Sequence, residues 1–159
     1  HFFDDRTYVE LGGQWIGPSQ DKMYELAKEF DIEIFPTYNS GKNILAIEQK
    51  IKTYKGVIPK IDYLALLDLE LSIKKLEKEA AKIDLKKPWN IKKASKFDSQ
   101  TVSNFLDNQV KSSKAKKILK AGLETVIAAN LSEISYLFTL FYIKSGTSLK
   151  NLINILNLY

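Results

Sequence analysis

Apolar residues recur every three or four positions from Ile61 to Ile83, with charged residues between them. Because an α-helix completes a turn in about 3.6 residues, this spacing places the apolar side chains on one helix face. The pattern predicts a long amphipathic helix that packs that face on a core. The positions on the predicted face are Ile61, Leu64, Leu67, Leu71, Ile73, Leu76, Ala80 and Ile83.

Three further helices are predicted after Pro88-Trp89, which interrupts this pattern. Each shows apolar residues at helical spacing and follows a short polar residue that is suited to cap a helix. The expected caps are Asp98 or Ser99 for the helix through Val110, Ser112 or Ser113 for the helix through Ile127, and Ser132 for the helix that ends at Lys144.

The N-terminal part shows shorter elements. Thr7 to Leu11 alternates in polarity and predicts a strand that leads to the glycine pair Gly12-Gly13. Apolar residues at helical spacing from Gln20 to Phe30 predict a helix. The β-branched and aromatic residues of Ile32 to Phe35 predict a second strand, which ends before Pro36.

A hairpin is predicted next, with Asn43 to Ala46 pairing with Ile51 to Tyr54 around Glu48 to Lys50. Together these elements indicate an α+β fold that is mainly helical. We expect two parts, a segment with short strands over residues 1–58 and a helical portion over residues 59–159.

The composition excludes several kinds of site. The chain has 159 residues, of which 45% are hydrophobic and 27% charged, as in ordinary globular proteins. It has no cysteine, which excludes disulfides and a cysteine nucleophile and is compatible with the predicted cytoplasmic location. The single histidine, His1, has no second ligand nearby, so neither a metal site nor a catalytic histidine is predicted. No apolar run reaches the roughly 20 residues that span a bilayer.

The formal charge of +5 raises the question of nucleic-acid binding. All the cations except Arg6 are lysines, whereas bidentate recognition of bases and phosphates favours arginine. The lysine pairs are better explained as solvated helix faces and loops, so no nucleic-acid partner is predicted.

The glycine pair is the best candidate for chemistry. Gly12 and Gly13 lack Cβ atoms, so their backbone can approach a flat ring closely, and Trp15 can add an apolar wall. Alone, such a pair is more often only a turn. The spacing from Gly13 to Gly17 is not a phosphate-binding loop, because the Lys-Ser/Thr ending is missing.

The segment from Val9 to Gln20 closely resembles the flavin-approach segment of the flavin-containing monoamine oxidase family. Further similarities follow in the family's order over roughly residues 5 to 152, which makes the resemblance more specific than any single motif. They are Phe35-Pro36-Thr37-Tyr38, Gly41-Lys42-Asn43, Tyr54-Lys55-Gly56, Ile58-Pro59, Pro88-Trp89, Phe97 to Thr101, Glu133-Ile134-Ser135 and Tyr142 to Gly146.

This resemblance implies an FAD cofactor and the oxidation of an amine, with oxygen converted to hydrogen peroxide. It implies that Gly12, Gly13, Gln14 and Trp15 lie beside the isoalloxazine and ribityl chain. It also implies a cavity for the amine substrate, lined from the last helix by Ile134, Leu137, Phe138, Phe141 and Tyr142. Read from their spacing alone, these five residues are equally suited to core packing.

The family's Gly-x-Gly-x-x-Gly opening and its later flavin segments, including a lysine and an aromatic pair, have no counterpart here. We therefore expect an internal fragment of an amine oxidase that is inactive alone and contains no catalytic side chain. Two alternatives remain: one subunit of a split oxidase with a complementing chain, and a helical interaction module without enzymatic activity. Which amine is oxidised does not follow from these residues.

Overall fold

The structure is a computed structural model that describes residues 15–38, 40–56 and 59–153. The chain divides into two compact units, residues 1–39 with 155–159 and residues 40–154. The strand predicted from Thr7 to Leu11 and the candidates Gly12, Gly13 and Gln14 lie outside the described residues. The assignment of 1–58 and 59–159 to two enzyme domains stays a prediction.

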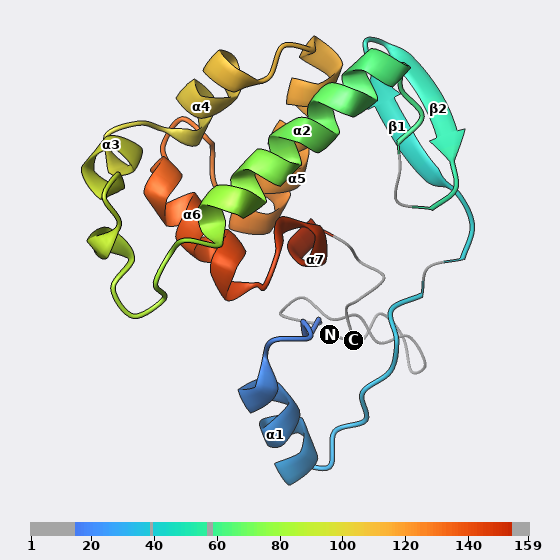
Figure 1. Cartoon of the computed structure of the whole chain (residues 1–159). Helices are drawn as coiled ribbons and strands as arrows, with labels where there is room; N and C mark the ends of the chain where they lie inside the picture. The colour runs from blue at the N-terminus through green and yellow to red at the C-terminus, as the bar shows by residue number, and fades with distance from the viewer. Residues whose placement is uncertain (1–14, 39, 57–58, 154–159) are drawn as a thin grey trace. The chain divides into compact units, whose positions relative to one another are not determined.

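In the first unit, helix α1 spans Asp21–Glu29, which confirms the predicted helix (Figure 1). The helix ends because Asp31 adopts a left-handed conformation with φ 51°. The Ile32 N–H then donates to the Ala27 carbonyl at 2.8 Å and the Asp31 N–H to the Lys28 carbonyl at 3.3 Å. These two bonds form a Schellman motif, which satisfies carbonyls at the helix end.

The strand predicted from Ile32 to Phe35 is wrong, because these residues form no strand in the structure. A strand needs a neighbour to pair with its backbone. None of the described residues provides one, and Ile32 and Phe35 are 60% and 69% exposed. β-forming side chains are therefore not sufficient to predict a strand, because pairing depends on a second segment.

The predicted hairpin is confirmed by strands β1, Asn43–Ile47, and β2, Lys50–Tyr54, which pair antiparallel. Glu48 and Gln49 form the turn, with φ values of 52° and 60°. Positive φ at both turn residues matches the twist of a two-residue hairpin.

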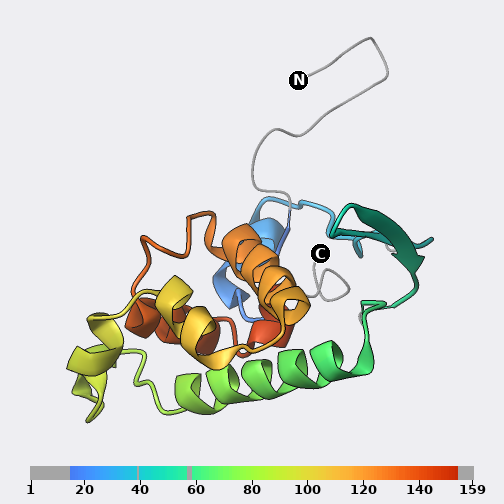
Figure 2. The same cartoon turned by 90° about the horizontal axis from the view of Figure 1, so that it is seen from above.

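The remaining elements of the second unit are helical. They are α2 Tyr63–Ala80, the 3₁₀ turn η1 Pro88–Asn90, α3 Ala94–Asp98, α4 Val102–Gln109, α5 Ser113–Ile127, α6 Tyr136–Ser145 and α7 Leu149–Ile153. Helix α2 packs against both α5 and α6, and the two views show it running along one side of the other helices (Figures 1 and 2). The mainly helical α+β class is therefore confirmed.

Two of the predicted caps are wrong. Helix α4 is capped by Thr101, whose Oγ1 accepts from the Asn104 N–H at 3.2 Å, because Asp98 and Ser99 end the short helix α3 instead. Helix α6 is capped by Ser135, whose Oγ accepts from the Phe138 N–H at 3.1 Å.

Ser132, the predicted cap of α6, bonds Asn130 Oδ1 through both its N–H and its hydroxyl. The turn at Asn130 therefore uses Ser132, and the helix begins one turn later. The other predicted cap is confirmed, since Ser112 Oγ accepts from the Ala115 N–H at 3.3 Å at the start of α5.

Helix α2 is confirmed, but its buried face differs from the predicted one. The residues that pack on the core are Ala65, Leu69, Ser72, Leu76 and Ala80. Three of the predicted core residues, Leu64, Leu67 and Leu71, are 75%, 41% and 57% exposed. At about 3.6 residues per turn these leucines lie on the side away from Leu69 and Leu76. Helix α2 therefore has two apolar faces, one buried and one exposed, which the sequence pattern did not distinguish.

The core of this unit is formed between α2, α4, α5 and α6. Its largest fully buried side chains include Leu76, Val102, Leu123, Leu131, Tyr136, Leu140 and Ile143. Among the residues that the structure describes, no helix combines the length and the apolar character needed to cross a bilayer.

Candidate functional site

Helix α6 is apolar on all sides. Tyr136, Thr139, Leu140 and Ile143 are buried in the core. A helix that is hydrophobic all round is normally enclosed by other elements. Here the side opposite the core is only partly covered.

That side carries the five residues predicted to line a substrate cavity. Phe138 is 45% exposed, and the other four, Ile134, Leu137, Phe141 and Tyr142, are half-buried. Ile134, Leu137 and Phe141 also pack against the core cluster. Leu137, Phe138, Phe141 and Tyr142 thus lie on one side of α6, whereas Ile134 lies in the segment before the helix. Both the packing and the lining interpretation remain compatible with this arrangement.

An aromatic group forms the exposed part of this face. The Phe138 ring centroid lies 6.2 Å from those of both Phe141 and Tyr142, in tilted arrangements. The Tyr142 hydroxyl donates to the Val126 carbonyl at 3.5 Å, which connects the group to α5. Aromatic side chains at such distances form a surface that suits an apolar or flat ligand.

Two polar contacts hold α6 against α2. The Tyr136 hydroxyl donates a hydrogen bond to Glu79 Oε2, and its ring stacks on Phe105 with centroids 4.3 Å apart and meets the Phe97 edge at 5.2 Å. Burial raises the pKa of Tyr136 well above its usual range, and the bond to Glu79 adds to this effect. Tyr136 therefore remains a protonated donor.

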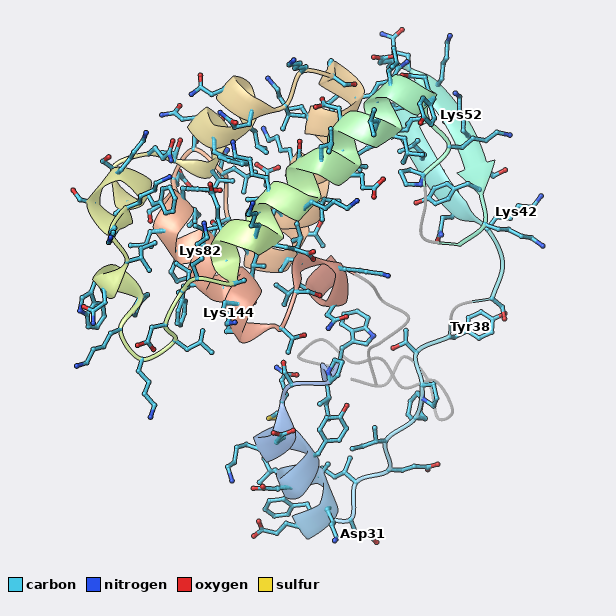
Figure 3. The ribbon with its side chains drawn as sticks, viewed as in Figure 1. Asp31, Tyr38, Lys42, Lys52, Lys82 and Lys144 are labelled. Carbon is cyan, nitrogen blue, oxygen red and sulfur yellow. The ribbon has the colours of Figure 1, made fainter. Side chains whose placement is uncertain are left out.

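At the same carboxyl end of α2, Lys144 from the last turn of α6 donates through Nζ to the Ala81 carbonyl at 3.4 Å, and Lys82 is the next residue of this segment (Figure 3). A cation at the carboxyl end of a helix is favourable, because carbonyl groups are unpaired there. The sequence analysis did not identify Tyr136 or Glu79. Helical spacing would have assigned Tyr136 to the core, but nothing in the sequence paired it with Glu79.

The segment before α6 is bonded to the segment before α4. The Val102 N–H donates to the Ile134 carbonyl at 3.1 Å, the Ser103 N–H to the Leu131 carbonyl at 3.0 Å, and the Tyr136 N–H to the Gln100 carbonyl at 2.9 Å. These bonds fix the position of Ile134 just before α6.

Of the four cofactor candidates, only Trp15 lies among the described residues. Its side chain is 53% exposed in the first unit, so an apolar ring face is open to a flat partner. A turn follows it, in which the Gly17 N–H donates to Gln20 Oε1 at 2.6 Å and the Gln20 N–H to the Gly17 carbonyl at 3.0 Å. The side chain of Trp15 is therefore accessible, and its role beside a flavin, like those of Gly12, Gly13 and Gln14, stays a prediction.

Within the described ranges, no group of histidine, aspartate and glutamate side chains is arranged to hold a metal ion. The five residues of the α6 face include no carboxylate, imidazole or amine side chain. The arrangement offers an apolar and aromatic surface to a ligand.

Residues 1–144 match a family model described as flavin containing amine oxidoreductase. A relative named "Probable flavin-containing monoamine oxidase A" from Dictyostelium discoideum is 31% identical over 140 residues, which are 87% of this chain and 31% of the relative. Human amine oxidase [flavin-containing] B is 26% identical over 138 residues, 86% of this chain and 26% of that protein. The chain thus spans about a third or less of the length of these relatives.

Solved structures show the same fold. A putrescine oxidase triple mutant superposes with a TM-score of 0.89 at 21% identity, over 98% of this chain and 36% of the other. Cyclohexylamine oxidase from Brevibacterium oxydans superposes with a TM-score of 0.83 at 19% identity, over 94% of this chain and 34% of the other.

Proposed function

Because the chain belongs to the family of flavin-containing amine oxidoreductases, we propose that it is part of an FAD-dependent amine oxidase. In this proposal it contributes a piece of the cofactor-binding domain and one helical wall of the substrate cavity. The complete enzyme oxidises an amine and reduces oxygen to hydrogen peroxide.

The observation that carries this proposal is the partly uncovered face of α6. Apolar residues cover that helix on every side, yet Phe138 is 45% exposed and its neighbours are half-buried. Such a face is expected where a helix borders a cavity that other parts of the protein complete. An apolar cavity favours the neutral amine over its ammonium form, because burying an unpaired charge is costly.

In this proposal the residues of this chain bind and position the amine and the flavin. Phe138, Phe141 and Tyr142 hold the amine's apolar part and exclude water, while Tyr136 keeps α6 in register with α2. Gly12, Gly13, Gln14 and Trp15 lie beside the flavin. When bound, the flavin supplies the two-electron oxidation of the C–N bond.

The chain alone is inactive in this proposal. Helix α1 has nine residues and buries only Ala27, whereas Met23, Leu26 and Phe30 are 45%, 44% and 65% exposed. Isolated helices this short are marginal in water, so α1 requires a partner surface for these side chains. Relatives about three times as long have the additional chain that could provide such a surface.

The same exposed face favours a second candidate, a split oxidase in which a complementing chain covers α1. The third, a helical interaction module without enzymatic activity, predicts instead that the chain is a stable monomer with no flavin and no partner. A cytoplasmic location stays a prediction in all three cases.

The test is to transplant this chain into the Dictyostelium relative, replacing the segment to which it aligns. We expect the chimera to retain flavin and to produce peroxide with an amine, and the isolated chain to do neither. Phe138→Asp in the chimera should raise KM for the amine, whereas Lys117→Glu, at an exposed position of α5, should not. A folded chimera that holds flavin but oxidises no amine would contradict the proposed cavity wall, and peroxide from the isolated chain would contradict its inactivity.

A further inference from the structure

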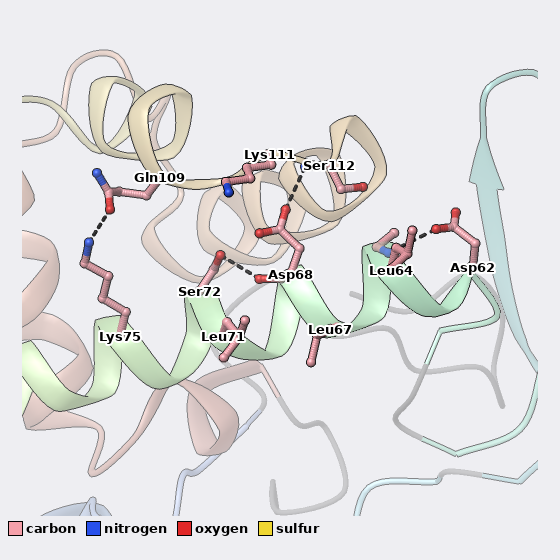
Figure 4. A pocket seen from close by; sticks show the side chains of 11 residues that line it. Asp62, Leu64, Leu67, Asp68, Leu71, Ser72, Lys75, Gln109, Lys111 and Ser112 are labelled. Atoms are coloured by element: carbon pink, nitrogen blue, oxygen red, sulfur yellow. Dashed lines mark hydrogen bonds between the residues drawn. The ribbon is translucent and has the colours of Figure 1, made fainter.

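An apolar groove runs along one flank of α2, which faces the connection from α4 to α5 (Figure 4). Its volume is about 660 Å³, and it lies between α2 and the connection from α4 to α5. Leu64, Leu67 and Leu71 form its apolar surface, with 75%, 41% and 57% of these side chains exposed. Leucines three and four positions apart form a continuous stripe on a helix, about 10 Å long over seven residues.

The walls of the groove are held by hydrogen bonds across it. Asp68 Oδ2 accepts from the Ser112 N–H at 2.6 Å, which connects the middle of α2 to the first residue before α5. Lys75 Nζ donates to Gln109 Oε1 at the end of α4, whereas the bond from Ser72 Oγ to the Asp68 carbonyl at 2.7 Å lies within α2. The groove is therefore preformed, so a partner would not have to order it on binding.

The charges along the groove are unequally compensated. Asp62 pairs with Lys114 at 2.9 Å, and this contact holds the pKa of the Asp62 carboxyl below its usual value. Asp68 is stabilised by the Ser112 N–H. Lys75 and Lys111, in contrast, form no ion pair with a carboxylate within the described ranges. The charge left for a partner is positive and lies where Lys75 and Lys111 border the groove.

We propose that this groove is a docking site for an amphipathic helix of another protein, with apolar side chains on the leucine stripe and an acidic side chain at Lys75 and Lys111. Helix-in-groove recognition uses apolar anchors at this spacing, and complementary charge sets the orientation. A second copy of the chain fits less well, because each copy has a net charge of +5 and would bring cations toward the lysines. This site is separate from the α6 face and does not rest on the proposed oxidase function.

The probe is a labelled helical peptide of about 18 residues, long enough to be stable with helix-favouring residues. It has leucines at three positions with the spacing of the stripe, and two glutamates one turn beyond them. A matched peptide has lysines in place of the glutamates. Binding to the full chain is measured by fluorescence anisotropy at low and high salt.

We expect the glutamate peptide to bind and the lysine peptide to bind at least about tenfold more weakly. Leu67→Asp should lower the affinity for the glutamate peptide by about tenfold or more, since it puts a charge in the centre of the contact. Lys111→Glu, alone and with Lys75→Glu, should invert the preference so that the lysine peptide binds better. A misfolded variant would lose affinity for both peptides, so an inverted preference shows that the variant is folded and recognises charge. Lys111→Glu alone leaves the contact between Lys75 and Gln109 in place.

Lys117→Glu is the matched control, because it reverses a charge at an exposed position outside the groove and should leave both affinities unchanged. Equal binding of the two peptides, or no binding of either, would overturn the proposal. It would also be overturned if sedimentation showed dimers that Leu67→Asp dissociates, or if the chain bound anionic phospholipid vesicles through the same leucines, because the groove would then serve a different partner.

Discussion

The Tyr136 hydroxyl donates to the Glu79 carboxylate, and this bond joins the first turn of α6 to the last turn of α2. Tyr136 is fully buried, while Glu79 is half-buried. The contact is therefore protected from water on the tyrosine side. It fixes how far α6 can slide along α2, and thus where the Phe138 face points.

Replacing Tyr136 by phenylalanine should lower the free energy of unfolding by about 1 to 3 kcal/mol, since a hydrogen bond to a charged group is lost. Urea denaturation of the two proteins measures the difference. Tyr142→Phe is the matched control, and because its bond to Val126 is 3.5 Å long the change there should be smaller. Equal effects of the two substitutions would contradict the importance assigned to the Glu79 contact.

Stability should fall at alkaline pH because of Tyr136. Its pKa in the folded protein is raised above the ordinary value of 10.0. Above that pH the unfolded chain loses the proton and the folded chain keeps it, so deprotonation favours unfolding. The contribution of Tyr136 to the free energy of unfolding is fully present below pH 10 and decreases as the pH rises further. Urea midpoints measured from pH 8 upward should therefore decline less steeply in Tyr136→Phe, and parallel slopes would exclude this origin.

Acid should weaken the start of α2. Lys114 holds the pKa of Asp62 below its ordinary value of 3.8, and Asp62 also caps α2 by accepting from the Ala65 N–H at 3.0 Å. Stability from this group is present above pH 3.8 and is lost as the pH falls through the lowered pKa. Asp62→Asn retains a capping oxygen without the charge, so its thermal midpoint should depend less on pH in this range. An unchanged pH dependence would contradict the role of the Lys114 pair.

Substitutions on the two sides of α6 should lower the free energy of unfolding by different amounts. Leu140 is fully buried, and Leu140→Ala should cost about 2 to 5 kcal/mol because it leaves a cavity. Phe138 is 45% exposed, so Phe138→Ala should cost clearly less in the free energy of unfolding. Chemical denaturation of the isolated chain gives both values. A cost at Phe138 equal to that at Leu140 would favour core packing over cavity lining.

A methyl group at Gly146 should displace the Leu152 side chain of α7. A Cβ built at this position would overlap the Leu152 side chain, although the Gly146 backbone itself, with φ −85°, accepts alanine. Gly146→Ala should cost about 1 to 3 kcal/mol, the usual range for overpacking. The double variant Gly146→Ala with Leu152→Ala should lose less free energy of unfolding than the two single variants lose together. If the two losses simply add, the methyl group and Leu152 do not clash.

Local signals were sufficient for several elements. The hairpin followed from two β-forming runs and a short connection, and α1, α2 and α5 followed from helical spacing with nearby stop and capping residues. Helical spacing also placed Leu137, Phe138 and Phe141 on one side of α6, and their role as a cavity wall stays a prediction. These features depend on neighbours within a few residues of the chain.

The errors concern contacts between distant residues and, for the cap of α6, a local turn that engages the predicted capping residue. Whether Leu64 and Leu67 or Leu69 and Leu76 face the core depends on where α5 and α6 pack, which α2's own pattern does not contain. The cap of α6 depended on the turn at Asn130, which engages Ser132 first. The Glu79 contact with Tyr136 joins residues 57 positions apart, and no local signal pairs them.

The unequal burial of α1 and α2 implies that amide hydrogens exchange with solvent at very different rates along the chain. Helix α1 has only Ala27 buried, so its amides should exchange through local opening that costs little free energy. Amides around Leu76 and Leu140, both completely buried, should exchange only when the whole helical unit unfolds. Binding of a partner over Met23, Leu26 and Phe30 would then be visible as slowed exchange in α1, with almost no change at the centre of α2.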